Sequence, residues 1–275
     1  MEKGGFLSFF EKIPFWKMFF YALEKKSLRG VSRKVDLYLF PWYNETERNG
    51  GVFMKNGTTV LFDLDGTLID TSRGVIESAL YTLAKLGYPT GEFGDYLPFL
   101  GPPLSFGFGV VCGVKESDVP RAIEIFRARY IGEEWFLRST VYPGIPELLA
   151  ALRGDGYRVA VTTSKLQLAA EKTLAVFGLS DLFDLVVGSA DSDGRNTKAG
   201  VVRYALKTLG AEPRDAVLVG DRCFDAEGAG AAGVGCVAAL WGFGKKEEFA
   251  PYPVVGYAEK PADVGVILSG FANRS

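Results

Sequence analysis

The stretch VLFDLDGTL, residues 60–68, constrains the fold more than any other part of the sequence. A short apolar run leads directly into Asp63 and Asp65, and Gly66 follows them. Such a run, ended by a glycine, predicts a buried strand that stops in a turn. Two carboxylates at the end of a buried strand repel each other and resist desolvation, which favours a cation bound between them. Gly66 permits a sharp turn, so both carboxylates can face one pocket.

Downstream of this strand, short apolar runs alternate with helical patterns. We expect strands over residues 58–62, 157–162, 185–187, 216–219, 235–239 and 254–257. Helices are expected over residues 145–153, 166–177 and 198–209. Strands that alternate with helices of this length predict a Rossmann-like α/β core, in which a parallel sheet carries helices on both faces. In such sheets ligands bind at the carboxyl ends of the strands.

One interval breaks this alternation. Between the first strand and residue 157 the sequence shows no convincing strand, and the pattern predicts helices over 71–86 and 119–135. Because the interval is too long for an ordinary crossover, we interpret residues 71–139 as an inserted α-helical cap with hinges at its two ends, 69–72 and 139–144. The catalytic core then comprises residues 54–70 and 140–275.

Residues 1–53 form an N-terminal extension that differs from the rest of the chain. Large aromatic residues crowd its first two dozen positions, and residues 1–34 contain eight Lys/Arg against three Glu. Its longest apolar run, 13–23, is shorter than the ~20 apolar residues that span a bilayer. Two interpretations stay open. The extension could contact an anionic membrane surface, or translation could start at Met54 and leave the extension outside the functional protein.

The composition excludes several kinds of site. The sequence contains no histidine, which excludes serine–histidine and cysteine–histidine catalysis and histidine-bound metals. A metal site must then be built largely from oxygen, which favours Mg²⁺. A net charge of −2 argues against a general nucleic-acid binder. The three cysteines are odd in number and widely spaced, so they indicate no disulfide framework and fit a reducing, cytoplasmic setting.

Polar residues follow the predicted strands at their carboxyl ends. After Asp63 and Asp65 on the first strand, the second ends in the segment 162–165, and the fourth ends in the segment 220–225. Lys198 begins the helix that follows the third strand. Three acids, a hydroxyl group and a lysine would therefore meet at one edge of the sheet.

This set of groups suits phosphoryl transfer, because a phosphate ester repels an attacking carboxylate and the site must neutralise both. Mg²⁺ held by Asp63, Asp221 and a backbone carbonyl would supply part of the charge. Lys198 and the hydroxyl group of Thr163 would bind phosphate oxygens. Asp63 could then attack phosphorus, while Asp65 would protonate the leaving oxygen and later deprotonate water.

With these residues in this order, the sequence resembles the haloacid dehalogenase-like (HAD) hydrolase superfamily. Its four motifs are matched by DLDGT at 63–67, Thr163, Lys198 and the segment 220–225 with Asp221 and Asp225. The segments LGPPL, TSK and LWGFG resemble the phosphoglycolate phosphatase-like branch with a helical cap. The resemblance covers about residues 56–265 and leaves the N-terminal extension unexplained.

The resemblance implies a role for each matched residue. Asp63 is the expected nucleophile and Asp65 the acid/base, with Thr163 and Lys198 completing the catalytic set. Gly66, Thr67, Ser164 and Lys165 are expected to contact the substrate. The expected Mg²⁺ ligands are Asp63, Asp65, Asp221 and Asp225.

The implied function is a Mg²⁺-dependent phosphatase that hydrolyses a small phosphorylated metabolite through an aspartyl-phosphate. Phosphoglycolate is the leading substrate, and the alternatives are a 5′-nucleotidase and a sugar phosphomutase of the same superfamily.

The segment 228–233, GAGAAG, matches the glycine pattern of dinucleotide-binding proteins. That fingerprint requires a strand, a glycine turn and then a helix, whereas this segment lies eight residues beyond its strand and leads into another strand. We therefore interpret the small residues as a surface for close helix packing. Asp225 could likewise cap the helix that follows it.

Overall fold

The computed structural model describes residues 58–190 and 193–272. The expected roles of the N-terminal extension, including membrane contact through residues 1–34, lie outside these residues. No helix in the described part of the chain is long and apolar enough to cross a membrane.

The core is a parallel sheet of six strands. In chain order these are β1 (Thr59–Phe62), β4 (Arg158–Leu166), β5 (Leu185–Ser189), β6 (Ala216–Gly220), β7 (Gly235–Ala239) and β8 (Gly256–Ala258). Their spatial order is β5-β4-β1-β6-β7-β8, and every neighbouring pair is parallel. The chain builds outward from β1 first on one side and then on the other. This arrangement puts a topological switch point beside β1, where open α/β sheets bind their ligands.

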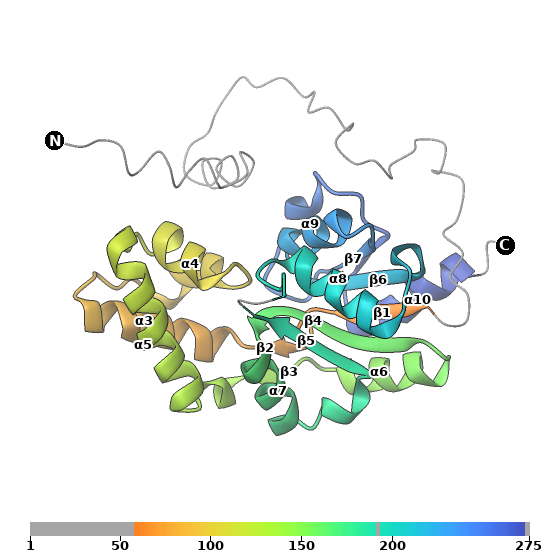
Figure 1. The fold of residues 1–275 in the computed structure, drawn as a ribbon, viewed down its shortest axis with the longest axis horizontal. Helices are drawn as coiled ribbons and strands as arrows, with labels where there is room; N and C mark the ends of the chain where they lie inside the picture. Colours follow the sequence, from red (N-terminus) through yellow and green to blue (C-terminus); the bar gives the residue numbers. More distant parts are fainter. Residues whose placement is uncertain (1–57, 191–192, 273–275) are drawn as a thin grey trace, which may run out of the picture. The chain divides into compact units, whose positions relative to one another are not determined.

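Helices cover both faces of the sheet, which confirms the predicted Rossmann-like α/β core (Figure 1). Val60 and Phe62 of β1 pack into an apolar cluster with α6 (Ile145–Gly154), α7 (Gln167–Val176) and α10 (Pro261–Ala272). Leu61 points to the opposite face and packs with α8 (Lys198–Leu209) and α9 (Cys223–Ala231). Alternation along one strand therefore supplies both faces of the core. Short 3₁₀ turns complete the core: η8 (Ser180–Leu182), η9 (Pro213–Asp215) and η10 (Lys246–Phe249).

The interval that breaks the strand–helix alternation is a helical insert. It contains, in order, α3 (Ser72–Leu86), η3 (Phe93–Phe99), α4 (Leu104–Phe106), η4 (Gly107–Val111), η5 (Glu116–Asp118), α5 (Val119–Arg127), η6 (Ala128–Gly132) and η7 (Trp135–Arg138). The helix expected over 119–135 is thus α5 extended by the π-helical turn η6, with η7 after it. The insert buries its own apolar cluster, in which Phe99 contacts Phe108 edge to face at 5.0 Å between ring centroids.

Two short strands join the insert to the core, although the sequence showed no convincing strand there. β2 (Ile69–Asp70) leads into the insert and β3 (Thr140–Val141) leads out of it, and the two pair in antiparallel fashion. Each has only two residues, so neither could produce a visible alternation in sequence. The amide of Gly66 donates to the carbonyl of Ile69 at 2.8 Å, which ties this ladder to the end of β1.

The glycine-rich segment 228–233 lies at the end of α9 and in the turn after it. A Cβ atom added to Gly228 would lie 2.5 Å from Cγ of Lys198, the first residue of α8. The glycine therefore lets α8 and α9 approach each other closely. This contact is the helix packing expected from sequence.

Candidate active site

Three acidic side chains converge at the carboxyl end of the sheet. Asp63 follows β1, and Asp221 follows the neighbouring strand β6, so their strand ends lie side by side. Asp225 lies in the first turn of α9, where its carboxylate accepts from the amide of Arg222 at 3.0 Å. One oxygen from each of the three lies within 4.8 Å of the others, and all three residues are buried. Asp225 therefore helps to cap α9 from the third position inside the helix, rather than from in front of it as expected, and it also belongs to the acidic group.

Lys198 bridges this group. Its ammonium donates to Oδ1 of Asp63 at 2.6 Å and to the carbonyl of Thr162 at 2.8 Å, and it lies 2.7 Å from Oδ1 of Asp225. Thr197 fixes the start of α8, because its hydroxyl accepts from the amide of Gly200 at 3.1 Å. Burial acts to lower the pKa of Lys198, but the carboxylates of Asp225 and Asp63 outweigh it and raise the pKa. The side chain therefore keeps its positive charge.

Burial and the neighbouring carboxylates disfavour the ionised forms of Asp63 and Asp221. Burial is the largest cause that raises the pKa of Asp63 to about 7; Lys198 opposes it, and Asp225 and Asp65 add to it. Burial, followed by the charges of Asp225 and Asp63, raises the pKa of Asp221 well above its ordinary value. A divalent cation would relieve both effects. The donors are carboxylate oxygens, as Mg²⁺ prefers, so the residues present fit this ion.

Asp221 lies in a cradle made by glycines, which sequence reasoning did not identify. A Cβ atom on Gly66 would lie 2.3 Å from Oδ2 of Asp221, and one on Gly242 would lie 2.3 Å from its Cβ. The amide of Phe243 donates to Oδ2 at 2.8 Å, and the hydroxyl of Thr67 donates to Oδ1 at 3.1 Å. The sequence indicated Gly66 only as a turn residue, and Gly242 only through the resemblance of LWGFG to the family.

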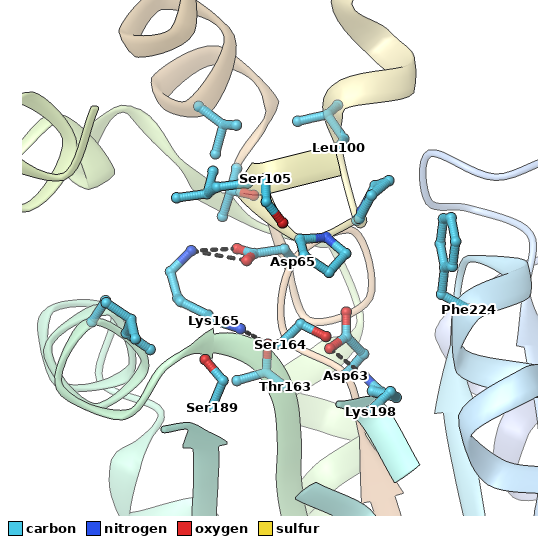
Figure 2. Close-up of a pocket in the computed structure, with 18 of the residues that line it drawn as sticks. Asp63, Asp65, Leu100, Ser105, Thr163, Ser164, Lys165, Ser189, Lys198 and Phe224 are labelled. Carbon is cyan, nitrogen blue, oxygen red and sulfur yellow. Dashed lines mark hydrogen bonds and ion pairs between the residues drawn. The ribbon is translucent and has the colours of Figure 1, made fainter. Parts of the chain in front are cut away.

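Asp65, which was also expected to contact Mg²⁺, lies outside the three-acid group. Both of its carboxylate oxygens accept from the ammonium of Lys165, at 2.7 and 2.9 Å, and the same ammonium lies 3.1 Å from the hydroxyl of Tyr130 in the insert. Figure 2 shows the Lys165–Asp65 pair and the Lys198–Asp63 pair as two separate contacts in one pocket. Asp65 keeps some exposure, with 21 % of its side chain accessible, so it can meet a ligand in the pocket.

The other expected residues divide into two sets. Thr163 and Ser164 line the pocket beside Asp63, where the hydroxyl of Thr163 also accepts from the amide of Lys165 at 3.2 Å (Figure 2). Gly66 and Thr67 are buried against Asp221, and neither is among the pocket-lining residues. The structure therefore brings Thr163 and Ser164 to the cavity wall and leaves Gly66 and Thr67 behind the acidic group.

The pocket has a volume of about 310 Å³ and is lined by both the core and the insert. The core contributes polar residues, including Ser189 and Lys198, together with Phe224 (Figure 2). The insert contributes a mainly apolar wall, which includes Leu104, Ile123, Phe126, Arg127, Tyr130 and Ile131.

Arg222 joins core and insert at the rim of this pocket. Its guanidinium donates to Glu248 of the core at 3.0 Å and to the carbonyl of Leu100 in the insert. The pocket can therefore hold a small ligand whose one end meets the acids and whose other end meets the insert.

Comparison with known proteins gives one family. The sequence profile of the haloacid dehalogenase-like hydrolases matches residues 60–239, which include the acidic group, Thr163 and Lys198. A solved structure of a haloacid dehalogenase-like hydrolase from Streptococcus pneumoniae superposes with a TM-score of 0.72 at 31 % identity, covering 77 % of this chain and 98 % of that one.

Two curated relatives carry names that refer to phosphoryl chemistry. A tyrosine-protein kinase from Mycobacterium tuberculosis is 37 % identical over 68 % of this chain, and the match spans 64 % of that relative's length. A phosphoglycolate phosphatase from Aquifex aeolicus is 33 % identical over 68 % of this chain and 86 % of its own length.

Proposed function

Because the chain belongs to the haloacid dehalogenase-like hydrolase family, we propose that it is a Mg²⁺-dependent phosphatase acting on a small phosphate monoester through an aspartyl-phosphate. The observation that carries the proposal is the position of Asp63, whose carboxylate lies in the pocket, is held by Lys198 and belongs to a buried three-acid group. The phosphatase name of the Aquifex aeolicus relative supports hydrolysis as the reaction.

In the first step Asp63 attacks phosphorus. A bond forms between its carboxylate oxygen and phosphorus, and the bond from phosphorus to the ester oxygen breaks. Lys198 holds the attacking carboxylate by its Oδ1, at 2.6 Å, and so restricts its orientation. Thr163 and Ser164 offer hydroxyl groups to the phosphoryl oxygens from the pocket wall. Asp65 donates a proton to the leaving oxygen.

In the second step water releases phosphate. Asp65, now ionised, accepts a proton from the attacking water as the water oxygen bonds to phosphorus. The bond between phosphorus and the Asp63 oxygen then breaks and restores the carboxylate. Mg²⁺, held by Asp63, Asp221 and Asp225, would neutralise negative charge on the phosphoryl oxygens.

The helical insert is proposed to act as a cap that closes over the substrate. Residues 69–72 and 139–144 are the expected hinges, and closure would exclude water while Asp63 reacts. Phosphoglycolate is the leading substrate, and a nucleoside 5′-monophosphate is the next. A sugar phosphomutase would use the same acids but return the phosphoryl group to a sugar.

A protein-tyrosine kinase is a second candidate, favoured by the 37 % identity to the mycobacterial relative of that name. A kinase would deliver the phosphoryl group from a nucleotide to a tyrosine hydroxyl, with Asp65 accepting the hydroxyl proton. The two functions differ in their products, because a phosphatase releases inorganic phosphate and a kinase leaves phosphotyrosine.

The test is phosphate release from phosphoglycolate and from an aryl phosphate, with Mg²⁺ and with a chelator. We expect Mg²⁺-dependent release that Asp63→Asn abolishes, while Asp181→Asn, an exposed acid in η8, keeps full activity. Undiminished release by Asp63→Asn would refute the covalent mechanism. Formation of phosphotyrosine from ATP, or of an isomerised sugar phosphate, without phosphate release would identify the kinase or the mutase instead.

A further inference from the structure

The positive charges that line the pocket are unequally compensated. Four cationic side chains line it: Arg127, Lys165, Lys198 and Arg222. Three of them have an acidic partner at 3.0 Å or less: Lys165 pairs with Asp65, Lys198 with Asp63 and Arg222 with Glu248. The side chain of Arg127 has no ion pair or hydrogen bond with any residue of the described ranges, 58–190 and 193–272.

The position of Arg127 in the fold assigns it to one end of the pocket. It is the last residue of α5, and Ile123, Tyr130 and Ile131 lie four residues before it and three and four after it. All four side chains line the pocket, so this stretch of α5 and η6 forms one face of the pocket wall. Tyr130 contacts Lys165, which holds Asp65. That face therefore borders the side of the pocket where Asp65 would protonate the leaving group.

The part of the insert that lines the pocket supplies no negative charge to Arg127. The polar side chains that the insert adds to the pocket wall are Thr71, Ser105, Arg127 and Tyr130, and its other contributions are apolar residues, proline and glycine. An exposed guanidinium in such a setting can turn to a ligand, and its planar donors match a carboxylate or a phosphate in a two-point contact. The pocket volume of about 310 Å³ restricts that ligand to a small metabolite.

We propose that Arg127 binds an anionic group on the leaving half of the substrate, either a carboxylate or a second phosphoryl group. The enzyme then prefers small phosphate compounds that carry negative charge on both sides of the scissile bond. This inference rests on the proposed phosphatase function and adds to it the chemical class of the substrate and the residue that selects it.

The experiment compares kcat/KM for three compounds of similar size. Phosphoglycolate carries a carboxylate, inorganic pyrophosphate carries a second phosphoryl group, and 2-hydroxyethyl phosphate carries a neutral hydroxyl group instead. We expect the wild type to prefer one charged compound, and which one it prefers identifies the anion. Arg127→Gln should lower kcat/KM for that compound about 10- to 100-fold, the range for a lost hydrogen bond to a charged group. Its rate with 2-hydroxyethyl phosphate should stay within about twofold.

A matched control lies on the same helix. Arg121 of α5 is exposed, pairs with Glu124 at 2.7 Å and does not line this pocket, so Arg121→Gln should leave all three values unchanged. Arg127→Lys should retain part of the preference because it keeps the charge. Equal losses for all three compounds in Arg127→Gln, or equal use of charged and neutral compounds by the wild type, would overturn the proposal.

A binding measurement separates this proposal from the phosphatase function. The three compounds are titrated calorimetrically into the wild type and into Arg127→Gln. The variant should lose affinity only for the charged compound that the wild type binds most tightly. If none of the three is hydrolysed but this affinity difference is present, the phosphatase function fails and the role of Arg127 stands. If turnover is present and no compound binds or reacts differently in Arg127→Gln, the role of Arg127 fails alone.

Discussion

Lys165 contacts both carboxylate oxygens of Asp65, at 2.7 and 2.9 Å, from the strand next to the one that delivers Asp65. The sequence predicted Lys165 as a substrate contact. In the structure its ammonium is engaged by Asp65 and by the hydroxyl of Tyr130. Its proposed role is therefore to orient the acid/base.

Replacing Lys165 tests this role. We expect Lys165→Met to lower kcat about 10- to 100-fold with little change in KM, because a misoriented Asp65 impairs proton transfer and leaves phosphate binding intact. Lys165→Arg should retain part of kcat, and Lys172→Met, an exposed lysine of α7, should match the wild type. Steady-state kinetics with 2-hydroxyethyl phosphate measure both constants. A rise in KM at constant kcat would restore the original prediction of a substrate contact.

Replacing Lys198 tests the electrostatics of the acidic group. Lys198→Met leaves Asp63 and Asp225 buried without their shared cation, so the free energy of unfolding without Mg²⁺ should fall by about 3 kcal/mol. Urea denaturation in a chelator measures it. Adding Asp225→Asn should recover part of the loss, since one buried charge disappears. Lys207→Met, on the exposed side of the same helix, is the control. If Lys198→Met lowered the free energy of unfolding no more than the control does, the contacts of Lys198 with Asp63 and Asp225 would contribute nothing to stability.

Two glycines with similar φ angles can distinguish the cost of backbone strain from the cost of a side-chain clash. Gly66 and Gly87 have φ of 86° and 75°, but a Cβ atom would lie 2.3 Å from Asp221 at Gly66 and would meet nothing within 4 Å at Gly87. Gly87→Ala should therefore cost only the backbone term, about 1–2 kcal/mol. Gly66→Ala should cost more and also abolish the stabilisation by Mg²⁺, because it displaces Asp221. Thermal unfolding with and without Mg²⁺ distinguishes these results, and equal behaviour of the two variants would contradict the cradle.

Magnesium should stabilise the protein in a pH-dependent way. The pKa of Asp63 is raised to about 7 from its ordinary 3.8, so the metal-free folded state keeps a proton that the unfolded chain releases. The stability that Asp63 contributes is present below about pH 4 and is lost as the pH rises through 7. Mg²⁺ competes with that proton, so it should raise Tm more at pH 8 than at pH 6. Asp221→Asn should remove most of the increase. Equal shifts at both pH values would contradict this linkage.

The sheet and its catalytic edge could be predicted from sequence because their signals are local. β1, β6 and β7 are short apolar runs that end in motif residues, and their predicted bounds agree with the structure to within one residue. The parallel order follows from the helices between them. Asp63, Asp221 and Asp225 could be grouped because the carboxyl ends of parallel strands share one edge.

The remainder depended on contacts between distant residues. Lys165 could not be assigned to Asp65 from sequence, because their separation of 100 residues is closed only by the pairing of β1 with β4. β2 and β3 have two residues each, too few for a pattern. Arg127 resembled any solvent-facing helical arginine until the structure showed which neighbours carry acids. Whether the insert closes as a cap stays a prediction.

The pairing of Ile69 with Val141 and of Asp70 with Thr140 brings the entrance and exit of the insert together. A segment of almost seventy residues thus enters and leaves the core at a single point. It also contacts the core through Arg222 and through the ammonium of Lys165 that holds Asp65. A change in the length or lining of the insert would leave β1 and Asp63 in place but would alter the contact that holds Asp65, so substrate choice and proton transfer are evolutionarily coupled within one chain.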